Sequence, residues 1–231
     1  MLTLAAGILV GISVVPGFAA SLNTTSQGFT PYQTCTLTGT PASTPVVADA
    51  GVLQSSPTTN YATNPSLGVV SGSGGNARTY IRFDLTACSP RIPASATVRL
   101  ASLRLFVTAL ATSCRTYDLF STKSSWSETV VTWNNQPFGT ALNNPPTGSR
   151  STSFNIGSPG GCQNATNSTY LSATLTSDLQ SFVAGSTSNF GWMLRDDAEN
   201  ATSTVYSTFS SKDAGVAAQA PQLIVTYVTV P

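Results

Sequence analysis

The side chains best suited to recognition are flat aromatic rings in a short block that begins Trp126-Ser-Glu and ends Thr-Trp133-Asn-Asn-Gln-Pro137. Aromatic faces attract the C–H groups of sugars and the charge of cations. We therefore predict a carbohydrate-binding site made by Trp126, Trp133, Tyr61, Tyr206 and Arg195. The alternative is structural, because a tryptophan in a β-hairpin is more often part of a core, and an arginine on a strand can form an ion pair within the sheet.

The densest acidic segment offers oxygen ligands for a metal ion. Asp196, Asp197 and Asn200 lie within five residues of one another, with Glu199 between them. Ca²⁺ takes six to eight oxygen ligands in proteins, so this segment is a candidate calcium site, which Asp49 and Asp213 could join in space. The alternative is a turn in which Asp and Asn cap their own backbone. No other cofactor is expected.

Catalytic chemistry has little support in the sequence. The chain contains no histidine, which removes the usual proton-transfer group near neutral pH and the commonest metal ligand. A glycosidase needs a pair of carboxyl groups across a cleft, and the nine acidic residues include no pair that the sequence marks out. We predict that the protein is not an enzyme, and a hydrolase or lyase is the weakest hypothesis.

Cysteine usage and the N-terminus both indicate export. Cys35, Cys88, Cys114 and Cys162 are even in number, widely spaced and free of any CxxC motif, which is typical of disulfides in a secreted protein. Three pairings are open, of which we expect Cys35–Cys88 and Cys114–Cys162. Residues 1–19 resemble a signal peptide with cleavage near Ala19. A buried N-terminal strand is the alternative, and an uncleaved segment would act as a membrane anchor.

Composition limits the partners. Only 8% of the residues are charged and the formal net charge is +1, so the chain has no field to attract polyanions. No run of Lys or Arg is present, and nucleic-acid binding is therefore not expected. A surface of hydroxyl and amide groups suits an extracellular domain that contacts a polysaccharide or a cell-surface glycan.

Hydrophobic residues follow a period of two in most of the chain. Leu103, Leu105 and Val107 alternate with polar or aromatic residues, and Trp192 and Leu194 do the same. This pattern predicts antiparallel strands that are buried on one face. One segment instead has a helical period, with Leu175, Leu179, Phe182 and Val183 on one side. We expect a short helix capped by Thr176 or Ser177 and ended by Gly185.

Several motifs, taken in order, resemble the DNRLRE domain family. They are Ala48-Asp49, Pro57-Thr-Thr-Asn-Tyr61, Thr79-Tyr-Ile-Arg-Phe-Asp-Leu85, Ala101-Ser-Leu-Arg-Leu105, the Trp126–Pro137 block, Gly191-Trp-Met-Leu-Arg-Asp-Asp197 and Ala220-Pro-Gln-Leu-Ile-Val-Thr-Tyr227. The resemblance implies an all-β, jelly-roll-like antiparallel β-sandwich, here with one short helix, that forms an extracellular module. Some members are carbohydrate-binding modules, and some bind acidic polysaccharides through basic residues. Because this chain has only Lys123 and Lys212 as lysines and no basic cluster, we expect a neutral or weakly charged glycan.

These observations lead to one domain organisation and two main functions. We expect a signal peptide at 1–19, a Ser/Thr-rich leader or linker at 20–44 and the β-sandwich at 45–231. The first hypothesis is a secreted, non-catalytic carbohydrate-binding module. The second is a structural or adhesive protein of the cell surface or of a filament. It would self-associate through a free sheet edge or an unpaired N-terminal strand within residues 21–40.

Overall fold

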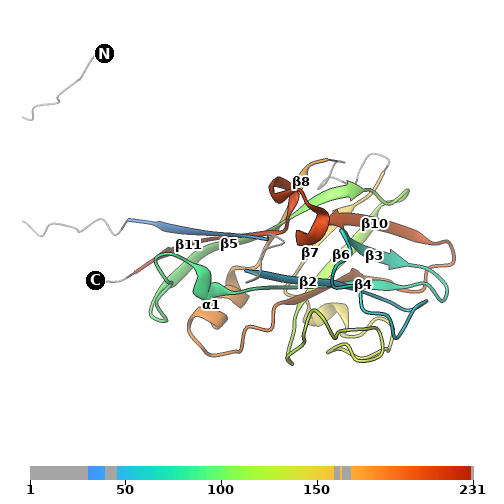
Figure 1. Cartoon of the computed structure of the whole chain (residues 1–231), viewed down its shortest axis with the longest axis horizontal. Coiled ribbons are helices and arrows are strands. Elements are labelled where there is room, and N and C mark those ends of the chain that lie inside the picture. Colours follow the sequence, from blue (N-terminus) through green and yellow to red (C-terminus); the bar gives the residue numbers. More distant parts are fainter. Residues whose placement is uncertain (1–30, 40–45, 159–161, 163–167, 230–231) are drawn as a thin grey trace, which may run out of the picture.

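The computed structural model describes residues 31–39, 46–158, 162 and 168–229 (Figure 1). The predicted signal peptide at 1–19 lies outside these residues. The described part contains one α-helix, α1 (Thr176–Val183), and eleven antiparallel strands, which confirms the prediction of an all-β antiparallel sandwich. None of its helices has the length and hydropathy of a membrane-spanning segment. The strands are β1 (Gln33–Thr38), β2 (Val47–Leu53), β3 (Ser66–Ser71), β4 (Ala77–Phe83), β5 (Thr97–Ala109), β6 (Arg115–Ser121), β7 (Thr152–Ile156), β8 (Tyr170–Thr174), β9 (Trp192–Asp196), β10 (Val205–Ser210) and β11 (Gln222–Val228).

The strands form two layers of one curled sheet. One layer runs through β2, β4, β9, β6 and β7, and the other contains β3, β10, β5, β8, β11 and β1. The layers join where Val70 of β3 pairs with Ala77 of β4. The main core lies between them, because alternate side chains of each strand point inward. It includes Ile81 and Phe83 of β4 and Leu103 of β5.

The helix packs against the same core. Leu179 and Phe182 are its buried residues, as the helical period predicted. Gly185 follows the last turn with φ +69°, which confirms its predicted role at the end of the helix. The predicted cap at the other end was wrong. Leu175 holds the N-cap position without a side-chain hydrogen bond, while the Thr176 hydroxyl accepts a hydrogen bond from the Ala101 backbone N–H.

Both expected disulfides are present, Cys35–Cys88 and Cys114–Cys162. The first attaches β1 to the segment after the 3₁₀ helix η1 (Leu85–Ala87). β1 pairs with β11 along its whole length, although its residues fall within the leader predicted at 20–44. The sheet therefore begins earlier than residue 45. The described part of the segment 21–40 is also already paired, which removes it as a free strand for subunit exchange.

The first layer is buried on both faces. Residues 122–151, which we call the covering loop, lie across the outer face of β2, β4, β9 and β6 (yellow-green in Figure 1). Its side chains join those of the sheet in a second hydrophobic cluster, in which Trp133 and Val131 contact a group that includes Tyr80, Phe120 and Met193. Burial on two faces explains why every residue of β9 is buried instead of alternate ones.

A buried arginine fixes the covering loop to the sheet. Arg78 of β4 is fully buried and forms a bidentate ion pair with Glu199, with N–O distances of 2.7 and 2.8 Å. Its remaining N–H groups donate to Gln136 Oε1 and to the carbonyl oxygens of Gly139 and Ala141. The guanidinium also lies 4.8 Å from the centre of the Trp133 ring. All five guanidinium donors are thus satisfied.

We expect Arg78→Met to destabilise the domain by about 3–5 kcal/mol, because it leaves the Glu199 carboxylate buried without a counter-charge. Urea denaturation with intact disulfides would measure this loss. The double variant Arg78→Met/Glu199→Gln should recover part of the stability, since no buried charge remains. Arg99→Met, at an exposed position of β5, is the control and should change stability by less than about 0.5 kcal/mol. A loss in Arg78→Met as small as that of the control would contradict this role.

A second charged group links the two layers at the edge of β2. Lys212 begins the 3₁₀ helix η3 (Lys212–Ala214), between β10 and β11. Its backbone N–H donates to Asp49 Oδ2 at 2.8 Å, and its ammonium contacts Glu128 Oε1 at 2.7 Å and Asp213 Oδ2 at 2.5 Å. Glu128 belongs to the covering loop and also accepts a hydrogen bond from the Asp49 backbone N–H. Burial lowers the pKa of Lys212, but its hydrogen bonds to Asp213 and Glu128 raise the pKa overall.

Asp49 should make the stability depend on pH. Burial raises its pKa to about 7, against partial lowering by Lys212. The folded protein therefore holds a proton on Asp49 that the unfolded chain releases near pH 4, and stability falls as the pH rises from about 4 to about 7. The loss is at most about 4 kcal/mol, from about 1.4 kcal/mol for each pH unit.

We expect Asp49→Asn to flatten this slope, measured as the free energy of unfolding in urea between pH 4.5 and 8. The amide removes the ionisation but keeps an acceptor for the Lys212 backbone N–H. Asp84→Asn, at an exposed carboxylate, should retain the slope of the unmodified protein. An Asp49→Asn slope equal to that of the unmodified protein would show that the carboxyl does not ionise in this window.

Candidate functional site

The two tryptophans predicted to bind a glycan belong to the covering loop and pack it against the sheet. Trp126 is 8% exposed and Trp133 is 3% exposed, and both belong to the second hydrophobic cluster. The Trp126 indole N–H donates to the Phe190 carbonyl oxygen at 2.7 Å. Trp126 lines a shallow depression of about 380 Å³ with residues such as Ser125, Val130 and Asn135. Neither ring presents an open face to solvent.

Arg195 and Tyr61 are also occupied by structural contacts. Arg195 has no exposed surface, and its guanidinium donates to the carbonyl oxygens of Asp196 and Pro145. It lies over the Phe120 ring at 4.9 Å. Tyr61 is half-buried and forms an isolated bridge with Gly51 of β2. The alternative expectation, an ion pair at Arg195, was wrong. Among the described residues, the hydrogen-bond partners of its guanidinium are backbone carbonyl oxygens.

Tyr206 is the one predicted glycan-binding residue that faces solvent, with 51% of its side chain exposed. It lies on β10 and points away from the core, because its neighbours Val205 and Ser207 point inward and are buried. Val70 of β3 pairs directly with it. The alternation along β10 puts Tyr206 on an outer face, but the sequence could not show that this layer is left uncovered.

The outward side chains around Tyr206 form a band that we call the open sheet face. Thr208 of β10 shares a hydrogen bond of 2.8 Å with Thr108 of β5. Phe106 packs edge-on against Tyr170 of β8, with ring centres 5.4 Å apart. The Arg104 guanidinium lies over the Tyr170 ring, 4.3 Å from the ring centre, and donates a hydrogen bond to Gln222 Oε1 of β11. The band is formed by Val70, Arg104, Phe106, Thr108, Tyr170, Tyr206, Thr208 and Gln222.

The side chains of the open sheet face are stacking and hydrogen-bonding groups. It combines aromatic rings with hydroxyl, amide and guanidinium groups, and the strands that form it contain no Asp or Glu. Burial raises the pKa of Tyr170, with Arg104 lowering it in part, so the Tyr170 hydroxyl stays protonated at neutral pH. That hydroxyl donates toward the carbonyl oxygens of Ala218 and Ala220. The open sheet face can stack on a ligand and exchange hydrogen bonds with it, but it offers no acid–base pair.

A cleft near α1 is lined by two arginines. It has a volume of about 480 Å³ and is lined by residues that include Arg82, Arg91, Phe182 and Asn189. We call it the arginine cleft. Arg82 lies over the Trp126 ring at 5.5 Å, and Arg91 is exposed. No basic motif marks this cleft in the sequence, because the two arginines are nine positions apart and line the same cleft only through the turn at η1.

The predicted calcium residues do not form one site. Asp196 is buried and paired with Arg115 through two hydrogen bonds, which raise the pKa of Arg115. Glu199 is held by Arg78. Burial and the neighbouring Asp196 charge raise the pKa of Asp197, and Asn200 is exposed with φ +70°. Ion pairing and a turn therefore account for this segment, and Asp49 and Asp213 lie with Glu128 instead.

The fold is an all-β module, and its open sheet face offers stacking and hydrogen-bonding groups to a ligand. The profile of carbohydrate-binding module family 96 matches residues 40–227, and the chain belongs to this family. No match was found among curated proteins. The expected likeness to a carbohydrate-binding module is confirmed, while the DNRLRE name for it stays a prediction.

Proposed function

We propose that this domain is a secreted, non-catalytic module that binds a neutral or weakly charged polysaccharide on the open sheet face. The observation that carries the proposal is the exposed Tyr206 ring on the layer that the covering loop does not reach. Membership of carbohydrate-binding module family 96 supports glycan binding. The two disulfides support an extracellular location, because they form in oxidising compartments.

Contacts along the band suit a sugar chain. A pyranose ring can stack on Tyr206 through its C–H groups, and its hydroxyls can exchange hydrogen bonds with Thr208, Thr108 and Gln222. Arg104 is already held between Tyr170 and Gln222, so it presents an ordered donor. Binding to a preformed surface loses little conformational entropy.

The same face gives a reason for binding without cleavage. Hydrolysis of a glycosidic bond needs two carboxyl groups, roughly 5 to 9.5 Å apart. No Asp or Glu occurs on β3, β5, β8, β10 or β11. A glycan on the open sheet face would therefore meet stacking and hydrogen-bonding groups only.

The arginine cleft provides the competing location. Arg82 and Arg91 could pair with carboxylate or sulfate groups of an acidic polysaccharide. Asp84 also lines the cleft and offsets part of this positive charge. We place the primary site on the open sheet face, and the experiment below distinguishes the two.

We expect Tyr206→Ala to weaken binding about fivefold, since a stacked aromatic contributes about 1 kcal/mol. Affinity electrophoresis of residues 31–231 against neutral and acidic polysaccharides would measure the change. Tyr206→Trp should retain binding, because the flat ring is preserved. Tyr32→Ala is the matched control, since Tyr32 is 64% exposed but lies outside the open sheet face.

Three other outcomes would redirect the assignment. Retardation only by acidic polysaccharides, lost in Arg91→Gln and kept in Tyr206→Ala, would move the site to the arginine cleft. Retardation that neither variant reduces would exclude both surfaces. No retardation by any polysaccharide, with the fold intact, would favour the structural or adhesive role, which sedimentation at high protein concentration would test as self-association.

A further inference from the structure

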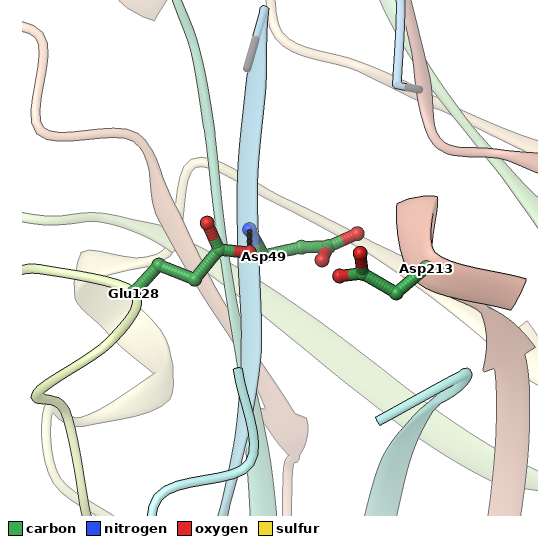
Figure 2. Close-up of side chains that lie close together, drawn as sticks. All are labelled: Asp49, Glu128 and Asp213. Atoms are coloured by element: carbon green, nitrogen blue, oxygen red, sulfur yellow. Dashed lines mark hydrogen bonds between the residues drawn. The ribbon is translucent and has the colours of Figure 1, made fainter. Parts of the chain in front are cut away.

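Three carboxylates from distant parts of the chain meet at the edge of β2. One oxygen each from Asp49, Glu128 and Asp213 lies within 4.8 Å of the other two. Figure 2 shows Glu128 approaching from one side and Asp213 from the other, with Asp49 between them. We call these three residues the carboxylate cluster. It shares no residue with the open sheet face or with the lining of the arginine cleft.

Asp49 carries an unsatisfied oxygen in this cluster. The residue is 1% exposed, and its Oδ1 atom has no hydrogen-bond partner among the described residues. Its carboxylate points toward that of Asp213 (Figure 2). An oxygen that is buried without a partner costs free energy, and a cation at this position would remove that cost.

Lys212 neutralises only part of the cluster. Its ammonium contacts Glu128 and Asp213 and does not hydrogen-bond to the Asp49 carboxylate, which is bound instead by the Lys212 backbone N–H. With all three carboxylates ionised, one ammonium leaves two negative charges in excess. A divalent cation in place of the ammonium would neutralise one more of these charges and contact all three groups.

We propose that the carboxylate cluster is a Ca²⁺ site at which the Lys212 ammonium competes with the metal. The ligands are all oxygen atoms, which excludes a preference for soft metals. Ca²⁺ tolerates irregular geometry and mixed carboxylate and water ligands, whereas Mg²⁺ demands a near-ideal octahedron. The Glu128 and Asp213 side chains are 13% and 18% exposed, so solvent can supply the remaining oxygens.

Lys212 can leave the site without unfolding the segment that carries it. Its charge lies at the end of a flexible four-carbon chain, while its backbone stays fixed by the hydrogen bond to Asp49. Ca²⁺ would then join β2, the covering loop and η3 more tightly than one ammonium does. This proposal does not depend on glycan binding, because the open sheet face shares no residue with the cluster.

The test uses the disulfide-intact domain, treated with chelator and then titrated with CaCl₂ at pH 8. We expect binding heat in calorimetry and a rise of a few degrees in melting temperature that depends on Ca²⁺ concentration. Asp49→Asn should abolish both signals. Lys212→Met should bind Ca²⁺ about fivefold more tightly or better, because the competing charge is gone.

Asp197→Asn is the matched control, since it alters the acidic segment at 196–200 and leaves the cluster intact. It should bind Ca²⁺ like the unmodified protein, and loss of binding in this variant would overturn the assignment to the cluster. The proposal also fails if Ca²⁺ gives no heat and no shift with the folded, unmodified protein. Binding only in Lys212→Met would overturn it as well, because it would show that the ammonium fills the natural site permanently. Circular dichroism would confirm that each variant is folded.

Discussion

The ion pair between Arg78 and Glu199 is the interaction on which the arrangement of this domain depends. It sits on the outer face of the first layer, where both side chains have no exposed surface. An arginine in that position would be unfavourable without full hydrogen bonding. The covering loop satisfies it through Gln136, Gly139 and Ala141, and Asn143 donates to the other partner, Glu199. The loop must therefore follow one path over the sheet.

That path decides which surfaces remain free for a ligand. Because the covering loop buries the outer face of β2, β4, β9 and β6, the surfaces left for a ligand are the opposite layer and the ends of the sandwich. Trp126 and Trp133, the most conspicuous aromatic residues of the sequence, are used to hold the loop. Tyr206 and the edge-packed pair Phe106 and Tyr170 remain outside.

The sequence predicted the class of fold because periodicity depends on one residue and its near neighbours. It predicted strands such as β5 and β9 and the helix at α1, but placed β1 in the leader. Of the three cysteine pairings that it left open, the expected one is present. The sequence could not show that Trp133 and Arg195 are buried, because their burial depends on a loop that folds back from elsewhere in the chain. The motifs behind the family resemblance contact one another. Asn60 donates to the carbonyl oxygens of Glu128 and Val131, and Arg82 lies over Trp126. They specify how the covering loop is held and give little information about the ligand.

Several of the few charged side chains in this chain also hold parts of the fold together. Seven of these few side chains are buried, namely Asp49, Arg78, Asp118, Arg195, Asp196, Glu199 and Lys212. They hold the covering loop, the β2 edge and the β6–β9 pair, where Asp196 pairs with Arg115. These seven charges therefore act as internal connectors, while the open sheet face carries Arg104 among hydroxyl, amide and aromatic groups. Such a surface loses little hydration of ions when a sugar chain lies on it, since few charges have to be stripped of water. This distribution of charge supports the proposed binding of a neutral glycan.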